Sequence, residues 1–125
     1  MSVFDNPNAV LQGLNSCNAN WKTGTGAYTN RRGERWGWAT TGLTMFNTIV
    51  PPNSKDYPWS SCRWNCNGCG ADNSHVANAN SNHPGGVNCT MGDGSVKFIK
   101  DAVSMRIWWS LGTKAGGEVV SSDSY

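Results

Sequence analysis

The sequence contains few residues of the kinds that build membrane spans and charged binding surfaces. Only 14% of its 125 residues are charged, and the formal net charge is +2, which is too small to attract nucleic acid or an anionic membrane by bulk electrostatics. It has no apolar run near the roughly 18 residues that cross a bilayer, and its N-terminus lacks the basic start and apolar stretch of a signal peptide. We therefore expect no nucleic-acid partner and, for the chain as given, no membrane contact.

Residue patterns that carry catalysis are also scarce. The chain has two histidines, His75 and His83, and it has neither a nucleophile-elbow serine nor a metalloprotease motif. Asp93 offers a general base, but its position directly before Gly94 is explained by a turn. The sequence therefore predicts a protein that is not an enzyme and that binds no cofactor.

Asparagine, glycine and tryptophan are abundant instead. The chain contains 15 Asn, 15 Gly and 7 Trp, whereas aliphatic residues are sparse. Such a composition favours turns, short strands and aromatic packing over long helices. The length suits one domain spanning residues 1–125. We predict an α+β, loop-rich fold in which a twisted antiparallel β-sheet is covered by one or two short helices.

Local signals place the first elements. Asp5 or Asn6 is the expected cap of a short helix that has Pro7 in its first turn and ends near Cys17. One face of this helix carries Val10, Leu11 and Leu14. A loop is expected from residue 21 to 28. Residues 31–50 are aromatic and β-branched and predict strands, whereas residues 51–86 are so polar that they predict a long loop.

The last third of the chain predicts a hairpin and a second helix. Val87, Cys89 and Met91 alternate with polar residues and form the expected inward set of one strand, and Val96 and Phe98 alternate with Lys97 in the next. Asp93-Gly94 between them suits a two-residue type I′ turn. A short helix then begins at Asp101 or Ser104 and ends at Gly112. Its expected core-facing residues are Val103, Ile107, Trp108 and Leu111.

Five cysteines are too many for routine cytosolic use in so short a chain. We favour one or two disulfides in an oxidising compartment, for example Cys17 with Cys62 and Cys66 with Cys69. The odd count leaves at least one thiol without an intramolecular disulfide partner, and Cys89 is expected to be that thiol, buried on its strand.

A structural zinc is the alternative reading of the cysteine cluster. Zinc accepts tetrahedral sulfur and nitrogen ligands, and the candidate set is Cys62, Cys66 and Cys69 with His83, His75 or Cys89. The second Cys-x2-Cys pair that would strengthen this reading is absent. The Cys-x3-Cys-x2-Cys spacing also matches that of radical iron–sulfur enzymes, but their barrel of roughly 200 residues is longer than this chain.

The tryptophans offer ligand contacts. Three arginines and two tryptophans lie close together in the sequence: Arg31, Arg32, Arg35, Trp36 and Trp38. They form either a cation–π patch that stacks on bases or sugars, or, as we favour, core tryptophans with arginines at the rim. Trp59 and Trp64 lie in the polar segment and are the stronger candidates for exposed contacts.

Three segments carry a family resemblance. HPGGVNCTMGDGSVKFI, at 83–99, resembles the His-x9-Asp-Gly signature of a prepilin-like bacterial family named domain of unknown function 1559. FNTIVPPNS at 46–54 and WWSLGTKAGGEVVSSDSY at 108–125 are similar to that family's middle and C-terminal signatures. Members of the family are similar to type IV pilins and type II secretion pseudopilins, which begin with a long apolar anchoring helix.

The resemblance implies a pilin-like C-terminal head domain without that helix, located at the cell surface or in the periplasm. Its implied role is structural or adhesive, with other pilin-like subunits or surface glycans as partners. A carbohydrate-binding module that uses exposed tryptophans is the rival function. The resemblance also implies a structural role for the signature residues, with the imidazole bonding to loop backbone and the aspartate forming the turn. These residues are His83, Pro84, Gly85, Gly86, Asp93 and Gly94.

Overall fold

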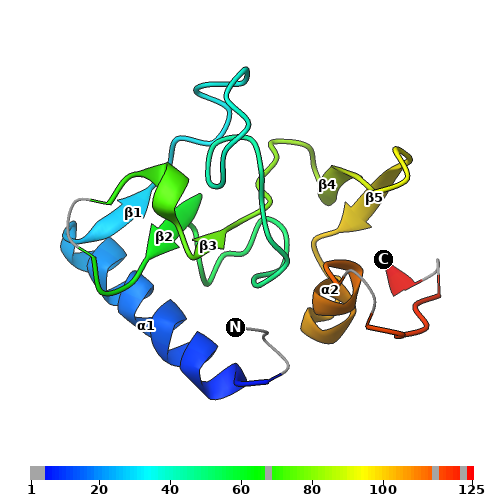
Figure 1. The fold of residues 1–125 in the computed structure, drawn as a ribbon, viewed down its shortest axis with the longest axis horizontal. Helices are drawn as coiled ribbons and strands as arrows, with labels where there is room; N and C mark the ends of the chain where they lie inside the picture. Colours follow the sequence, from blue (N-terminus) through cyan, green and yellow to red (C-terminus); the bar gives the residue numbers. More distant parts are fainter. Residues whose placement is uncertain (1–4, 67–68, 114–115, 122–123) are drawn as a thin grey trace.

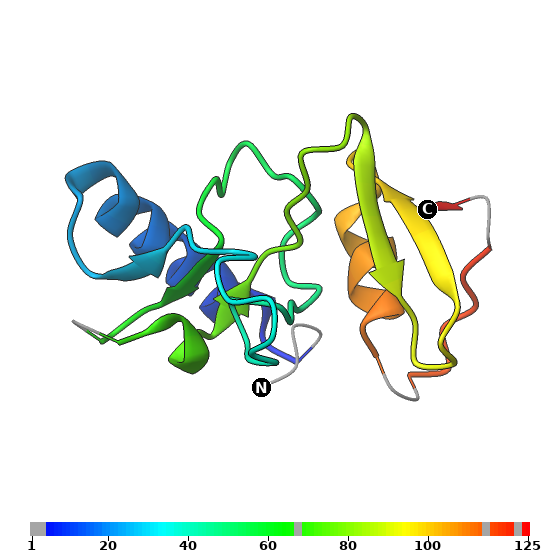
Figure 2. The same ribbon diagram turned by 90° about the horizontal axis from the view of Figure 1, so that it is seen from above.

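The chain folds into two small lobes that lie side by side (Figures 1 and 2). The computed structural model describes residues 5–66, 69–113, 116–121 and 124–125. The first lobe consists of α1 (Pro7–Thr23), β1 (Ala27–Thr29), β2 (Ser61–Arg63), the 3-10 turn η1 (Ala71–Asn73) and β3 (Val76–Ala77). The second lobe consists of β4 (Gly86–Thr90), β5 (Val96–Lys100) and α2 (Met105–Leu111). These elements confirm the predicted α+β class.

The strands form two separate antiparallel sheets. In the first, β2 is central and pairs through Cys62 with Tyr28 of β1 on one side and with Val76 of β3 on the other. In the second, β4 pairs with β5, and Val87 lies opposite Ile99. Helix α1 packs along the first sheet and α2 along the second, as Figure 2 shows.

Helix α1 starts where its sequence predicts and ends later. Asn6 is the cap, because its side-chain oxygen accepts the Ala9 N–H at 3.1 Å. The helix continues through Thr23, so the predicted end near Cys17 is wrong. Its second half is held by Asn18, which bonds to the distant residues 56 and 59, a contact that local sequence does not reveal. No helix in the described part of the chain combines the length and hydropathy of a membrane-spanning segment.

The predicted strand and loop segments in the middle of the chain are exchanged. Residues 31–50, all of which the structure describes, contain turns and one isolated bridge instead of strands. Turn hydrogen bonds such as Gly33 N–H to the Leu43 carbonyl (3.0 Å) fold this segment back on itself, which overrides its strand propensity. Residues 51–86 were predicted to be a loop but supply β2 and β3, and β1 likewise lies in the predicted loop from 21 to 28.

The core of the first lobe is built on Trp59, whose side chain is 0% exposed. The predicted surface exposure of Trp59 is therefore wrong. Its indole N–H donates to the Asn18 side-chain oxygen at 3.0 Å, which satisfies the buried polar atom. The other buried members of this core are Val10, Leu14, Cys17, Val50, Cys62 and Val76. Leu11, predicted to share the apolar face of α1, is 47% exposed.

Asparagine side chains replace sheet hydrogen bonds in the irregular segments. Asn78 is 1% exposed, and its amide donates to the carbonyls of Tyr57 and Trp59, both at 2.9 Å. Asn47 donates to the His75 carbonyl at 2.9 Å. These two amides therefore satisfy backbone carbonyls that a short sheet leaves unpaired.

The β4–β5 hairpin buries one face and exposes the other. Val87, Cys89 and Ile99 are at most 4% exposed, whereas Val96 and Phe98 are 63% and 47% exposed. Because directly opposed residues share a face, the pairing of Val87 with Ile99 fixes this division. The apolar residues of β5 are thus split between the two faces.

The hairpin turn differs from the predicted two-residue type I′ turn. Met91 N–H donates to the Ser95 carbonyl at 2.8 Å, which leaves a three-residue loop, Gly92-Asp93-Gly94. Only Gly94 of this loop has a positive φ, at 82°. Hydrogen bonding by Ser95 lowers the pKa of Asp93, whose carboxylate accepts the Ser95 N–H at 2.9 Å. This geometry is a type I turn followed by a left-handed residue.

Replacing Gly94 by valine should lower the free energy of unfolding by about 1–3 kcal/mol, because a β-branched residue is strained at positive φ. A Cβ atom at Gly94 would meet no other atom within 4 Å, so the cost is conformational and not steric. Gly92 is the matched control, since it lies in the same turn with equally open space and no positive φ. Denaturant unfolding should give a clearly lower free energy of unfolding for Gly94→Val than for Gly92→Val. Equal stability of the two variants would contradict the assigned turn.

Helix α2 follows its predicted signals and fixes the two lobes together. Ser104 caps it by accepting the Ile107 N–H at 3.3 Å, and it ends at Gly112 as predicted. The indole N–H of Trp108 donates to the Val50 carbonyl at 2.6 Å, and that of Trp109 to the Ile49 carbonyl at 2.9 Å. Val50 belongs to the first core and Trp108 to the second. The FNTIVPPNS segment is therefore the junction between the lobes.

Candidate functional site

The most exposed aromatic side chains lie on one loop, residues 30–45, which we name the arginine–tryptophan loop. It projects at the top of Figure 1, away from both sheets. Trp36 is 87% exposed and Trp38 is 52% exposed. The favoured prediction that these two tryptophans fill the core is therefore wrong. The fully buried tryptophans are Trp59 and Trp108.

The loop is anchored at its base and divides two hollows. Leu43 is 7% exposed and lines both of them. Hydrogen bonds within the loop, such as Thr44 Oγ1 to the Trp38 carbonyl at 2.8 Å, hold its shape. Arg31, Glu34, Arg35 and Trp38 line one hollow, whereas Arg32 and Trp36 line the other. Residues that are adjacent in the sequence of this loop therefore line different hollows.

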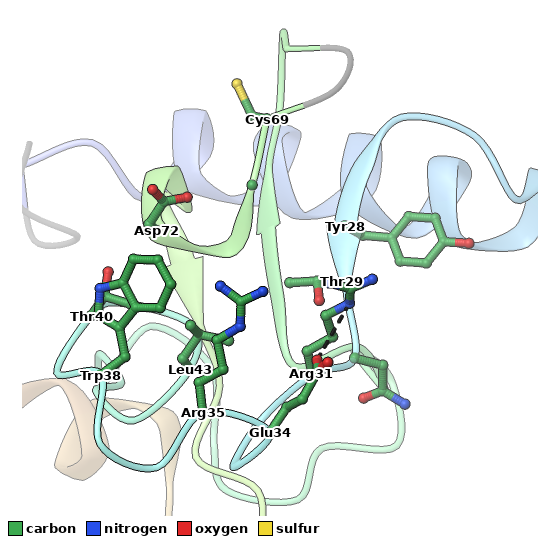
Figure 3. Close-up of a pocket in the computed structure, with 12 residues that line it drawn as sticks. Tyr28, Thr29, Arg31, Glu34, Arg35, Trp38, Thr40, Leu43, Cys69 and Asp72 are labelled. Carbon is green, nitrogen blue, oxygen red and sulfur yellow. Dashed lines mark ion pairs between the residues drawn. The ribbon is translucent and has the colours of Figure 1, made fainter.

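The first hollow, which we name the Trp38 hollow, has a volume of about 640 Å³ (Figure 3). The Arg35 guanidinium lies 4.9 Å from the centroid of the Trp38 ring, and Arg31 pairs with Glu34 at 3.5 Å. Asp72 of η1 also lines this hollow. This combination of an aromatic ring, a cation and carboxylates is typical of sites that bind polar ligands with an apolar face.

The second site consists of two adjoining hollows of about 430 and 640 Å³, which we name the Arg32 cleft. Four residues line both hollows: Arg32, Asn80, Ser81 and His83. Arg32 is half-buried, and burial lowers the pKa of its guanidinium. Its two terminal nitrogens both donate to the Met45 carbonyl at 3.3 Å, while Nε is buried without a partner. In the described part of the chain this guanidinium has no carboxylate partner.

His83 and Asp93 are not brought together. They lie beyond opposite ends of β4, whose five residues alone extend about 15 Å. The backbone N–H of His83 donates to Ser81 Oγ at 3.1 Å, whereas its exposed imidazole makes no hydrogen bond to a described residue. The predicted bond from the imidazole to loop backbone is therefore wrong. Asp93 does form the turn, through Ser95.

The Pro84-Gly85-Gly86 bend is explained by close packing at the start of β4. The Gly85 carbonyl accepts the Asp101 N–H at 2.9 Å, which extends the hairpin by one contact. A Cβ atom at Gly86 would collide with the Phe98 ring and the Ile99 carbonyl. Only glycine fits there, so these residues shape the backbone.

The cysteines form two disulfides, Cys17–Cys62 and Cys66–Cys69, which are the pairs given as examples from the sequence. The zinc reading is wrong, because the three sulfurs that it requires as thiolates are bonded to other sulfurs. The residues that the structure describes contain no group of three His, Cys, Asp or Glu arranged to hold a metal. Two disulfides in 125 residues are typical of an oxidising, extracytoplasmic environment.

Two of the remaining candidates, Cys89 and Trp64, are buried and half-buried, whereas His75 is exposed. Cys89 is a free thiol, 4% exposed, and burial raises its pKa. Trp64 was predicted to be exposed, but it is half-buried over Gly13 and contacts the His75 ring at a centroid distance of 4.4 Å. Burial, and secondarily Arg63, lowers the pKa of His75. Trp64 is thus part of the packing of the first lobe.

Sequence reasoning missed most of the Arg32 cleft. Arg32 is indistinguishable in the sequence from its exposed neighbours Arg31 and Arg35. Asn80 lies in a run of asparagine and alanine that carries no ligand signature. The only available signal was the position of His83 beside a Pro-Gly-Gly bend, which predicts an exposed loop but no neighbours.

No curated protein and no solved structure matches this chain. A family model matches residues 9–106, and its description is a protein of unknown function, DUF1559 (SBP_bac_10). The match includes the junction segment, both disulfides and the β4–β5 hairpin with its His-x9-Asp-Gly signature. It covers well over half of the chain. The chain therefore belongs to the DUF1559 family.

Proposed function

We propose that this chain is a noncatalytic, extracytoplasmic, pilin-like module that makes structural or adhesive contacts at the cell surface or in the periplasm. The observation that carries the proposal is the arginine–tryptophan loop. Trp36 and Trp38 are 87% and 52% exposed on a loop anchored to a scaffold with two disulfides. Tryptophan and arginine are, with tyrosine, the residues most enriched at the energetic centres of protein contacts.

Several observations support a role without catalysis. His83 and Asp93 lie beyond opposite ends of a strand, so they do not form an acid–base pair. Cys89 is buried, and its raised pKa disfavours the thiolate that a nucleophile needs. The disulfides support an extracytoplasmic location. The resemblance of the family to pilins supports other pilin-like subunits or surface glycans as partners.

Carbohydrate binding is the second candidate function. The Trp38 hollow places a half-exposed indole among Arg35, Glu34 and Asp72, which are hydrogen-bonding groups suited to sugar hydroxyls (Figure 3). A pyranose presents an apolar face that stacks on such a ring. Under this candidate function the contact made by the module is with a surface glycan.

The double variant Trp36→Ala, Trp38→Ala should weaken binding of the domain to cell-envelope fragments from its source by about tenfold or more, because exposed tryptophans at contact centres each contribute roughly 2 kcal/mol. Its melting temperature should stay near that of the parent, since both side chains are exposed. Leu11→Ala is the matched control, because Leu11 is 47% exposed on α1, outside the arginine–tryptophan loop.

Two interactions of the disulfide-intact domain are measured. Its binding to the envelope is measured as retention on immobilised envelope fragments, and its self-association is measured by sedimentation. Loss of either interaction in the tryptophan variant, with Leu11→Ala unchanged, supports the contact function. Unchanged envelope binding and self-association in both variants would refute it.

A further inference from the structure

Among the residues that the structure describes, no carboxylate pairs with the Arg32 guanidinium. Its neighbours in the arginine–tryptophan loop are satisfied, because Arg31 pairs with Glu34 and Arg35 stacks on Trp38. A half-buried charge without a counter-charge is unfavourable. Arg32 nevertheless shares a single carbonyl, that of Met45, between two terminal nitrogens at 3.3 Å, near the long limit for hydrogen bonds. A guanidinium has five N–H donors, so three remain unused, one of them on the buried Nε.

Two polar groups around Arg32 lack hydrogen-bond partners among the described residues. The side-chain oxygen of Asn80 is buried without a hydrogen-bond partner, so it can accept a donor. The exposed imidazole of His83 lines the same cleft and makes no hydrogen bond to a described residue. These unused groups meet where the two hollows of the cleft adjoin.

The formal charge of the cleft favours an anion. Arg32 and Lys55 line it against one carboxylate, that of Asp101. Asp101 is already engaged, because the Asn53 amide donates to it at 2.8 Å. The planar donors of a guanidinium pair bidentately with a carboxylate or a phosphate.

Aromatic side chains line one side of the cleft and favour a ligand that has an apolar face. Trp36, 87% exposed, and Phe46 line the hollow that Arg32 shares with His83. An apolar ring face beside an anion site, with a free amide acceptor, suits a sugar that carries both a carboxylate and hydroxyls. We infer that the Arg32 cleft binds an acidic saccharide, with the uronate carboxylate on Arg32, a hydroxyl donating to Asn80 and the sugar face on Trp36.

This inference rests on the proposed contact function, for which it names a ligand class and a site. The probe is trigalacturonate, titrated calorimetrically into the disulfide-intact domain, and its methyl ester is the matched ligand without charge. The acid should bind about tenfold or more tightly than the ester, because charge-assisted hydrogen bonds to arginine are lost on esterification. Arg32→Gln should abolish this preference. Arg35→Gln, which removes a neighbouring cation from the Trp38 hollow, should preserve it.

Asn80→Asp provides a second variant in case Arg32→Gln does not fold. It places a carboxylate in the cleft, retains Arg32 and should weaken binding of the acid more than binding of the ester. Equal affinity for acid and ester, or equal loss in the Arg32 and Arg35 variants, would overturn the inference. An acidic peptide such as tri-glutamate that binds as tightly as the saccharide would overturn the ligand class. If trigalacturonate does not bind while the Trp36, Trp38 variant still loses envelope contact, the cleft proposal fails and the contact function stands.

Discussion

Replacing Trp108 by alanine should lower the free energy of unfolding by about 3–5 kcal/mol, the usual cost of removing a large buried aromatic side chain. Trp108 is 1% exposed and stacks on Phe46 with ring centroids 5.8 Å apart. The substitution also leaves the buried Val50 carbonyl without the donor that now lies at 2.6 Å. Because Val50 belongs to the first core, we expect both lobes to lose stability.

Urea unfolding followed by circular dichroism measures this effect, and Trp36→Ala is the matched control. Trp36 is 87% exposed, so its removal should change stability by less than about 0.5 kcal/mol. Trp108→Phe separates the two contributions, since it keeps much of the ring and removes the indole N–H. A Trp108→Ala variant as stable as Trp36→Ala would mean that α2 does not join the lobes.

Removing the Cys17–Cys62 disulfide by the double variant Cys17→Ala, Cys62→Ala should cost about 4 kcal/mol, because the bridge closes a loop across a sequence separation of 45 residues and restricts the unfolded chain. Both cysteines are 0% exposed in the core of the first lobe. The bridge attaches α1 to the central strand β2.

The Cys66–Cys69 pair is the internal control. Its separation of 3 residues predicts a smaller cost, about 2 kcal/mol, for Cys66→Ala, Cys69→Ala. Reductant should also open this bridge first, because its cysteines are partly exposed whereas Cys17 and Cys62 are not. A larger loss of stability from the short bridge than from the long one would contradict the assigned connectivity.

The parts of the fold that were predictable from the sequence depend on local signals. Asn6 and Ser104 cap their helices, and alternation identified the β4–β5 hairpin, because each pattern acts within a few residues. The turn type was mispredicted because Asp-Gly suits two loops of different length, and the Met91 to Ser95 hydrogen bond decides between them.

The middle of the chain was not predictable because its order depends on distant contacts. Trp59 lies among polar residues in the sequence, and its burial depends on Asn18, 41 positions away. Trp36 shows the opposite error: its strand-like sequence surroundings suggest that it is buried, yet the turns of its loop leave it exposed to solvent. Likewise Arg32 is distinguished from Arg31 by the neighbourhood of His83, which only the folded chain creates.

The oxidation state of the cysteines in the cell tests the central claim, a disulfide-closed extracytoplasmic module, most directly. Thiols are alkylated in intact cells of the source organism. The protein is then unfolded and alkylated with a second reagent, and its intact mass is measured without reduction. With two disulfides among five cysteines, we predict that the protein is lighter by four hydrogens than the fully reduced chain, apart from the added alkyl group. One thiol, Cys89, should be alkylated, and only by the second reagent, after unfolding. Five thiols alkylated without reduction would contradict the account.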